Sequence, residues 1–344
     1  GSQNSDSISI HGQGGIYARG GEVHISGKQI SIQADSDKDN ALMNNGGTIT
    51  VGGKDTEFID VSGGIVSHGS QISLEGKNVS ISKGKHENAI YTDGGTVSIR
   101  ADGNNEAHIS GPITNDMGNI SISLSGKPAY LNSPLKTNND YGKTDLSLSD
   151  KASWNLSDIN SNFTTYTGDD GIIHLDNETH QTVTISNKFK DNGTRIHEDI
   201  YGSKNTGNDT IHIDNSYTGN THFWLVNRDD TDKGVVGTVL ASALKKESGS
   251  TNGANALMIM AAMPAAASAA DPIADFKANH FAAYGMNSLF FKTYGLGTKD
   301  CDRADTQDYT KDLYITDVTN HVTNDKGQYT PTVSAAFSGS SLMY

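Results

Sequence analysis

The chain has 344 residues, of which 38 are glycine, 34% are hydrophobic and 7% are aromatic. This composition suits thin, turn-rich β structure better than a thick globular core. A net charge of −14 opposes contact with phosphate backbones, which argues against nucleic acid as a partner.

Cysteine is used once, at Cys301, so no intrachain disulfide framework can form. A long β-rich extracellular protein without disulfides suits a chain that crosses a membrane unfolded and folds afterwards. An ordinary cytosolic protein is equally compatible with one cysteine. Residues 1–7 are predicted to form the N-terminal edge. Because Gly1 and Ser2 resemble a cloning remnant, the start of the chain says nothing about a signal peptide.

A short repeat is written four times in the first 110 residues. Its copies are IYARGG at 16–21, LMNNGG at 42–47, IVSHGS at 65–70 and IYTDGG at 90–95. The first glycine of each copy lies 26, 23 and 25 residues after the one before. A period of this size indicates stacked structural units rather than a domain with one closed core.

After the Gly-Gly or Gly-Ser pair of each copy, aliphatic residues alternate with polar ones, which places them on one face of short strands. One unit cannot bury such a face alone, but stacked units can. The predicted fold class is therefore all-β, a right-handed parallel β-helix with three short strands per coil over residues 8–175. The predicted inward residues are Ile16, Leu42, Ile65 and Ile90, then Val23/Ile25, Ile49/Val51, Ile72/Leu74 and Val97/Ile99, then Ile30/Ile32, Ile59/Val61, Val79/Ile81 and Ala107/Ile109.

Outward residues form columns beside the inward ones. One predicted column is Tyr17, Met43, Val66 and Tyr91, and another is Glu22, Thr48, Gln71 and Thr96. These columns are either an ordinary solvated face or a flat sheet that presents aromatic and hydrogen-bonding groups to a glycan or to another copy of the chain. On the second interpretation the candidate binding residues are Tyr17, Tyr91, Thr48, Gln71 and Thr96. The irregular loops around 112–145 are the next candidates.

Several segments of the second half carry a resemblance to a known family. DTIHIDNSYTG at 209–219, FWLVN at 223–227, GTVLA at 237–241, FFKTYGLGT at 290–298 and DLYIT at 312–316 follow one another in this order. The succession resembles the C-terminal end of the passenger of type V bacterial autotransporters, of the pertactin-like or self-associating adhesin type. WNL at 154–156 is similar to the coil that precedes this end. The resemblance covers 150–318 by segments and 1–110 by architecture only. The Ala- and Met-rich stretch 253–272 departs from it and looks like an insertion.

The resemblance implies a domain plan and a location. Residues 176–318 are expected to be a β-hairpin-bearing C-terminal cap, the autochaperone region, which covers the open edge of the β-helix. Residues 319–344 are expected to extend toward a translocator barrel that this sequence lacks and that would attach the chain to the outer membrane. The implied location is the bacterial cell surface or the extracellular space. The apolar run 256–263 is cut by Pro264 and is too short to span a bilayer.

The resemblance implies a non-enzymatic adhesin that binds glycans or proteins of a host or of other bacteria, or itself, as in aggregation and biofilm formation. The alternative is a secreted glycan-active enzyme, a polysaccharide lyase or hydrolase, on a β-helix scaffold. A glycosidase needs two carboxylates on one face, but neighbours on a strand point to opposite faces, so Asp169 and Asp170 are predicted to form a turn. No Gly-x-Ser-x-Gly motif suggests a nucleophile. No catalytic residue is predicted.

Calcium is the one cofactor that the sequence suggests. Asp35, Asp37 and Asp39 alternate as at the start of an EF-hand loop, although Asn40 replaces the required glycine and Gly46 the final glutamate. An acidic surface loop is the alternative interpretation. The histidines of the repeats, His24, His68 and His108, fall in different columns and are predicted to be exposed polar residues.

Overall fold

The computed structural model describes residues 6–35, 40–83, 88–102, 107–156, 160–200, 209–218, 221–227, 236–245, 255–262, 314–316, 319–324 and 329–338. Within these ranges every regular element is a β-strand, and the predicted all-β fold of stacked parallel strands is confirmed. None of the described segments supplies a helix with the length and hydropathy of a membrane span. The chain divides into two compact units, 1–173 and 174–344.

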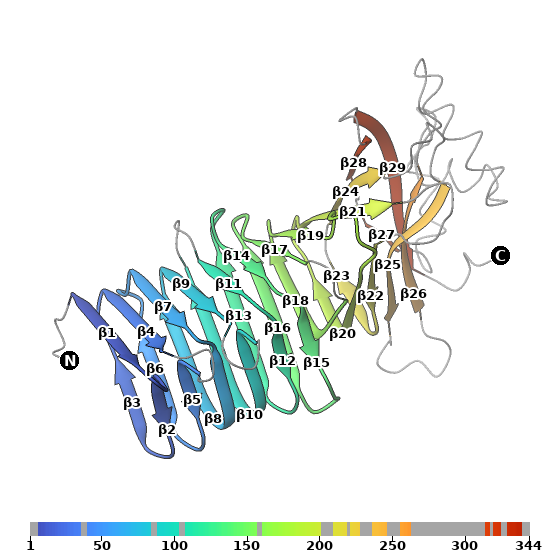
Figure 1. Ribbon diagram of the computed structural model, residues 1–344. Coiled ribbons are helices and arrows are strands. Elements are labelled where there is room, and N and C mark those ends of the chain that lie inside the picture. Colours follow the sequence, from blue (N-terminus) through green and yellow to red (C-terminus); the bar gives the residue numbers. More distant parts are fainter. Residues whose placement is uncertain are drawn as a thin grey trace. The chain divides into compact units, whose positions relative to one another are not determined.

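The strands of the first unit stack as a β-solenoid in three parallel columns (Figure 1). The first column holds β2 (Ile16–Ala18), β5 (Leu42–Asn44), the starts of β8 (Ile65–Gly76) and β10 (Ile90–Ala101), β12 (Ile113–Asn115), β15 (Leu135–Thr137) and the start of β18 (Ser161–Asp169). The second holds β3 (Glu22–Ile25), β6 (Thr48–Gly52), the ends of β8 and β10, β13 (Asn119–Ser125), β16 (Lys143–Ser149) and the end of β18. The third holds β1 (Ser7–Gly12), β4 (Gln29–Ala34), β7 (Phe58–Ser62), β9 (Asn78–Ser82), β11 (His108–Ser110), β14 (Tyr130–Asn132) and β17 (Ser153–Asn155).

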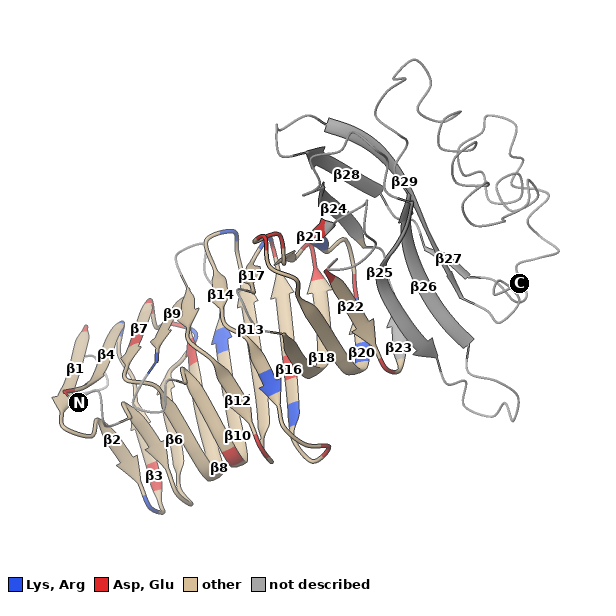
Figure 2. Cartoon of the chain, turned by 45° about the vertical axis from the view of Figure 1, so that its right-hand side comes forward, with Lys and Arg blue, Asp and Glu red and all other residues tan. Residues whose placement is uncertain are grey.

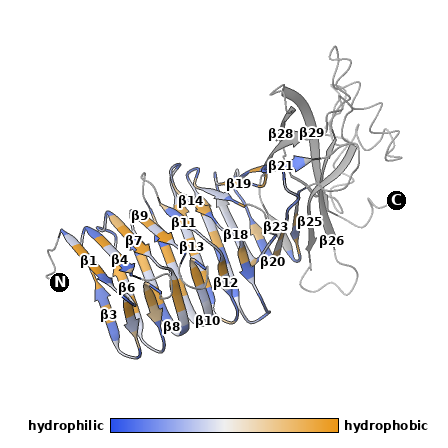
Figure 3. Cartoon of the chain, viewed as in Figure 1, coloured by the Kyte–Doolittle hydropathy of each residue, from blue (hydrophilic) through white to orange (hydrophobic). Residues whose placement is uncertain are grey.

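The core is the set of inward columns that the sequence predicts. Leu42, Ile65 and Ile90 are rungs of one in-register ladder and all are buried. Ile16 occupies the first rung of this ladder and is only half-buried, because β2 pairs on one side with β5 and has no other described neighbour in its column. Figure 3 shows the alternation of apolar and polar residues along the described strands that produces this core. Each fully buried aliphatic side chain contributes about 1.5–3 kcal/mol.

The turns between the first and second columns are closed by glycine and by buried polar side chains. Gly95 takes a φ of 80°, and a Cβ there would lie 2.2 Å from the carbonyl oxygen of Ser70 in the neighbouring coil, so only glycine fits. Asn115 is fully buried, and its amide nitrogen donates to the carbonyl oxygens of Gly118 and Lys143, each at 3.0 Å. Its amide oxygen accepts the Gly118 N–H at 2.8 Å. The turn is thus pinned from inside the solenoid.

The predicted turn at Asp169 and Asp170 lies where β18 ends. Asp170 takes a φ of 57°, which is left-handed backbone typical of turns. The carbonyl oxygens of both residues accept the backbone N–H groups of Asp150 and Lys151 in the preceding coil. The two aspartates therefore shape a corner of the solenoid.

The second unit begins within β19 (Ile172–His174) and contains both parallel and antiparallel pairs. Its strands are β20 (Thr182–Lys190), β21 (Arg195–Ile200), β22 (Thr210–Ile213), β23 (Ser216–Thr218), β24 (His222–Asn227), β25 (Val236–Lys245), β26 (Asn255–Ala262), β27 (Tyr314–Thr316), β28 (Thr319–Asn324) and β29 (Tyr329–Ser338). Parallel pairing joins β20 to β22 and β23, β21 to β24, β22 to β25 and β24 to β28. Antiparallel pairing joins β25 to β26, and β29 to β26, β27 and β28.

Parts of the predicted domain plan fall on these strands. Consecutive antiparallel strands β25 and β26 lie within the predicted cap, and β26 lies inside the stretch expected to be an insertion. β28 and β29 lie within the expected C-terminal extension, 319–344. Residues 290–298, part of the family resemblance, are outside the described residues. The capping role of this region stays a prediction.

Candidate functional site

The first predicted outward column is a real ladder. Tyr17, Met43, Val66 and Tyr91 are in register on β2, β5, β8 and β10. Tyr17 is 52% exposed, but Val66 is only 4% exposed, because the larger side chains of Met43 and Tyr91 lie on the rungs beside it. Neighbouring strands are about 4.8 Å apart, which places Tyr17 roughly 14 Å from Tyr91. One sugar ring cannot stack on both tyrosines, whereas an oligosaccharide can span them.

The second predicted outward column is also in register. Glu22, Thr48, Gln71 and Thr96 are successive rungs on β3, β6, β8 and β10. Gln71 is exposed, while Thr48 and Thr96 are half-buried. The structure therefore brings Thr48, Gln71 and Thr96 together, on the far side of the glycine turn from the tyrosine ladder.

The hydroxyl of Tyr91 is already engaged by the protein. It donates a 2.8 Å hydrogen bond to Oδ2 of Asp116, and the amide of Asn138 donates to the other oxygen of the same carboxylate. Burial, reinforced by the hydrogen bond to Asp116, raises the pKa of Tyr91 to about 12. Tyr91 is half-buried, and its hydroxyl proton is already donated within the protein.

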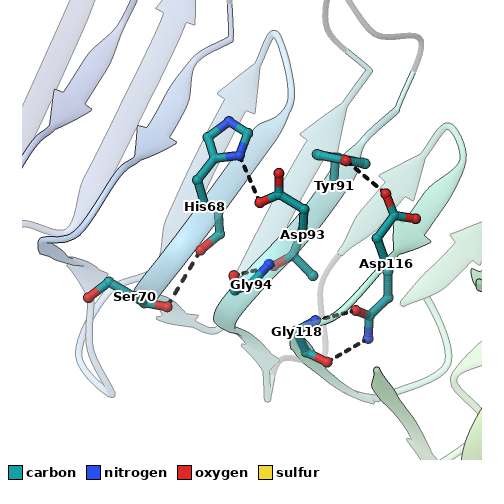
Figure 4. A network of polar contacts seen from close by, with 10 residues as sticks. His68, Ser70, Tyr91, Asp93, Gly94, Asp116 and Gly118 are labelled. Carbon is teal, nitrogen blue, oxygen red and sulfur yellow. Dashed lines mark hydrogen bonds and ion pairs between the residues drawn. The ribbon is translucent and has the colours of Figure 1, made fainter. Parts of the chain in front are cut away.

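A histidine–aspartate pair lies next to this tyrosine. Nδ1 of His68 lies 2.8 Å from Oδ1 of Asp93, and the rings of His68 and Tyr91 meet edge-on with centroids 6.3 Å apart. Figure 4 shows His68 reaching toward Asp93, and Tyr91 toward Asp116. Each hydrogen-bonded pair joins residues 25 apart in sequence, which is one coil. Because residues one repeat step apart lie on neighbouring coils, this spacing could have predicted both contacts from the sequence.

We define the corner row as the residues at the turn between the first and second columns that face outward in successive coils: His68, Asp93, Asp116, Met117, Asn138 and Tyr141. All four copies of the repeat have glycine at this turn, as Gly20-Gly21, Gly46-Gly47, Gly69-Ser70 and Gly94-Gly95. The two coils after these copies place large side chains at the turn, with Met117 57% and Tyr141 82% exposed. These two side chains give a partner apolar surface to contact, and the polar groups of the row lie at the same turn of neighbouring coils. The sequence interpretation named the loops around 112–145 but neither of these residues.

The prediction for the repeat histidines is correct in one case. His24 is exposed, with Nε2 3.3 Å from Glu22 Oε2. The prediction is wrong for His68 and His108, which are half-buried. His68 is covered by its contacts to the next coil, and the ring of His108 packs against Tyr130 with centroids 4.0 Å apart.

Among the calcium candidates, the structure describes only Asp35. It is exposed, and its Oδ1 lies 2.8 Å from Nδ1 of His11. Asp37 and Asp39 lie outside the described residues. Calcium binding at this loop stays a prediction.

A separate cluster in the second unit combines two histidines and a carboxylate. His174 Nδ1 lies 3.0 Å from Asp176 Oδ1, and His197 Nδ1 lies 3.8 Å from Asp176 Oδ2. Burial alone would raise the pKa of Asp176, but the hydrogen bond and charge of His174 lower it on balance. Burial, and then the charge of His174, lower the pKa of His197 to about 4. The sequence interpretation did not single out these residues.

Charged residues are dispersed along the strands of the first unit. Figure 2 shows scattered Lys, Arg, Asp and Glu positions among mostly uncharged residues, with neither sign forming a continuous stripe along the described strands. The strongest local features are therefore the corner row and the histidine cluster. Comparisons with protein-family models, with curated proteins and with solved structures found no match for this chain.

Proposed function

We propose that this chain is part of the passenger of a bacterial autotransporter adhesin, displayed at the cell surface and without enzymatic activity. Two features support the proposal. The parallel β-solenoid is compatible with such a passenger, and the ordered segments between 154 and 316 resemble its C-terminal end. On this proposal a translocator barrel outside this sequence attaches the chain to the outer membrane.

The observation that carries adhesion is the corner row. It places exposed Tyr141 and Met117 at the same turn of successive coils as the carboxylates of Asp93 and Asp116. An aromatic face with planar carboxylates and amides at its rim can stack on a sugar ring and bond to its hydroxyl groups. The proposed partner is therefore a surface glycan, with a surface protein or a second copy of the chain as the other outcomes of the test.

Repetition supplies the affinity that one contact lacks. A hydrogen bond contributes only about 0.5–1.5 kcal/mol net. The polar contacts in the row are already made between neighbouring coils, so the row is held in place before a partner arrives, which limits the entropy cost of binding. Many copies on a cell then raise the overall avidity without any new contact.

The test compares two double variants and one single variant with the wild type. Met117→Ala with Tyr141→Ala removes the exposed part of the corner row, and Tyr17→Ala with Tyr91→Ala removes the tyrosine ladder. Phe58→Ala is the control, because Phe58 is an aromatic residue that is 40% exposed and lies on β7, in the third column. Circular dichroism confirms the fold of each variant.

Each variant is applied to a glycan array and to a bead-aggregation assay. We expect Met117→Ala/Tyr141→Ala to weaken binding at least tenfold, the tyrosine-ladder variant to weaken it less, and Phe58→Ala to leave it unchanged. Equal binding by all folded variants would reject the corner row as the adhesive surface. Release of reducing ends or unsaturated sugars by the wild type would reject the adhesin in favour of a glycan-active enzyme.

A further inference from the structure

The cluster of His174, Asp176 and His197 is assembled from two segments one coil apart. His174 ends β19, Asp176 follows two residues later, and His197 lies within β21. The backbone N–H of Leu175 donates to the carbonyl oxygen of His197 at 2.8 Å, which holds the two segments side by side. His174 and His197 are 23 residues apart, which equals one step of the N-terminal repeat. The stacking of coils therefore brings the two histidines together.

The distances suit a single ion. One ligand atom from each residue lies within 4.8 Å of the other two. Zinc bonds to nitrogen and oxygen are about 2.0–2.1 Å, so tetrahedral ligand atoms are roughly 3.3 Å apart. The two histidine–aspartate separations, 3.0 Å to Oδ1 and 3.8 Å to Oδ2 of Asp176, lie on either side of that value. The imidazole rings of His174 and His197 lie side by side, with centroids 4.4 Å apart and planes at 41°.

The side chains are accessible without being fully solvated. The exposed fractions are 36% for His174, 25% for Asp176 and 24% for His197. An ion can therefore reach the cluster from solvent, and the partial burial limits competition from water for its ligands.

We propose that His174, Asp176 and His197 bind one divalent transition-metal ion of the zinc class. Imidazole nitrogen suits Zn²⁺, Cu²⁺ and Ni²⁺, whereas Ca²⁺ and Mg²⁺ prefer oxygen ligands alone. Three protein ligands leave a fourth position for water or for a group from a binding partner. This site is distinct from the candidate calcium loop at Asp35 and does not depend on the proposed adhesive role.

The ion cross-links two consecutive coils of the second unit. Because the unfolded chain does not hold the three ligands together, binding stabilises the folded state and raises its melting temperature as metal is added. A single histidine–aspartate pair within one coil does not cross-link coils, so added metal is not expected to raise the melting temperature through it. The chain contains such a pair for comparison, since His212 Nε2 lies 3.0 Å from Asp214 Oδ1 with the same two-residue spacing.

The experiment uses the full chain, purified without a histidine tag and without chelator. Zn²⁺ is titrated by calorimetry, and Co²⁺ is added separately as a probe whose visible spectrum reports coordination. Variants His174→Ala, His197→Ala and Asp176→Asn remove the ligands, and His212→Ala is the matched control. We expect one ion per chain, affinity at least about tenfold weaker in each ligand variant, and no change in the control.

A second measurement does not depend on the variants folding. Diethyl pyrocarbonate modifies accessible histidines, and mass spectrometry reports which ones. In the wild type, Zn²⁺ should protect His174 and His197 from modification and leave His212 reactive. Absence of a one-to-one binding event, binding unaffected in the folded double variant His174→Ala/His197→Ala, or equal modification of His174 and His197 with and without Zn²⁺ would each overturn the proposal.

Discussion

The indole nitrogen of Trp154 donates a 2.8 Å hydrogen bond to the main-chain carbonyl oxygen of Ser133 in the preceding coil. Trp154 is fully buried, and its ring meets that of Phe163 at 90° with centroids 5.5 Å apart. One large side chain thus fills the core of these coils and also satisfies a backbone group of its neighbour.

Replacing Trp154 with Phe tests this double role. We expect the free energy of unfolding to fall by about 2–4 kcal/mol, because the Ser133 carbonyl loses its partner and the smaller ring leaves a cavity. Urea denaturation followed by far-UV circular dichroism measures the change. Met117→Ala, at an exposed position, serves as control and should stay within about 0.5 kcal/mol of wild type. A loss below 1 kcal/mol in Trp154→Phe would contradict the assigned role.

A charge placed in the stack should be far more damaging than one placed beside it. Ile90 is fully buried between Ile65 and Ile113 on neighbouring strands. We expect Ile90→Asp to cost about 3–5 kcal/mol, because the carboxylate has no partner there. Ser98→Asp, on the outward face of the same strand, is the control. Comparable melting temperatures for the two variants would show that Ile90 does not face the core.

The buried turn at Asn115 offers a graded test. We expect Asn115→Ala to destabilise the protein by about 2–3 kcal/mol, since two carbonyl groups and one N–H group lose their partner. Asn115→Thr should cost less, because Thr92 fills the equivalent rung of the preceding coil and its hydroxyl accepts the Gly94 N–H at 3.2 Å. Thermal melts of both variants give the order, and equal losses would refute the argument.

The stability of the second unit should depend on the protonation of Glu198. Neither carboxyl oxygen of this fully buried residue has a hydrogen-bond partner among the described residues. Burial, and then the charge of Asp209, raise the pKa of Glu198 well above 4.5. The native state therefore holds its proton at a pH where the unfolded chain has released it, so this group's contribution to stability falls as pH rises above about 4.5.

Glu198→Gln removes that dependence. We expect the variant to be more stable than wild type by about 1–3 kcal/mol at pH 8, with the gap closing toward pH 4.5. Urea denaturation at both values measures the gap, and the exposed Glu57→Gln is the control. A gap that grows toward acidic pH has the wrong sign and would rule out a raised pKa.

The fold could be predicted because the repeat shows which residues of successive coils pair with one another. Alternation at Ile49 and Val51 defines an inward face, and the glycine steps align it with Ile72 and Leu74 in the next coil, as the structure shows. Burial of outward positions was harder to predict. Val66 is shielded by side chains of two other coils, and alternation within one strand contains no information about them.

The candidate sites depend on contacts between coils rather than on local motifs. His68 with Asp93, and His174 with His197, look unrelated until their separations are compared with the repeat step. Exposure of Tyr141 could not be read from the sequence for a different reason. It lies in a five-residue turn, 138–142, where the Gly-Gly pattern is lost and alternation no longer applies.

The ladder of the first unit has a mechanical consequence. Its inter-coil hydrogen bonds run along the direction in which the coils stack, so tension applied in that direction loads the outermost coil before the others. A coil occupies about 4.8 Å in the stack but holds about 25 residues, which span roughly 85 Å when extended. A surface tether built in this way would lengthen as single coils unfold one after another. Each unfolding step relieves tension while the remaining coils stay folded.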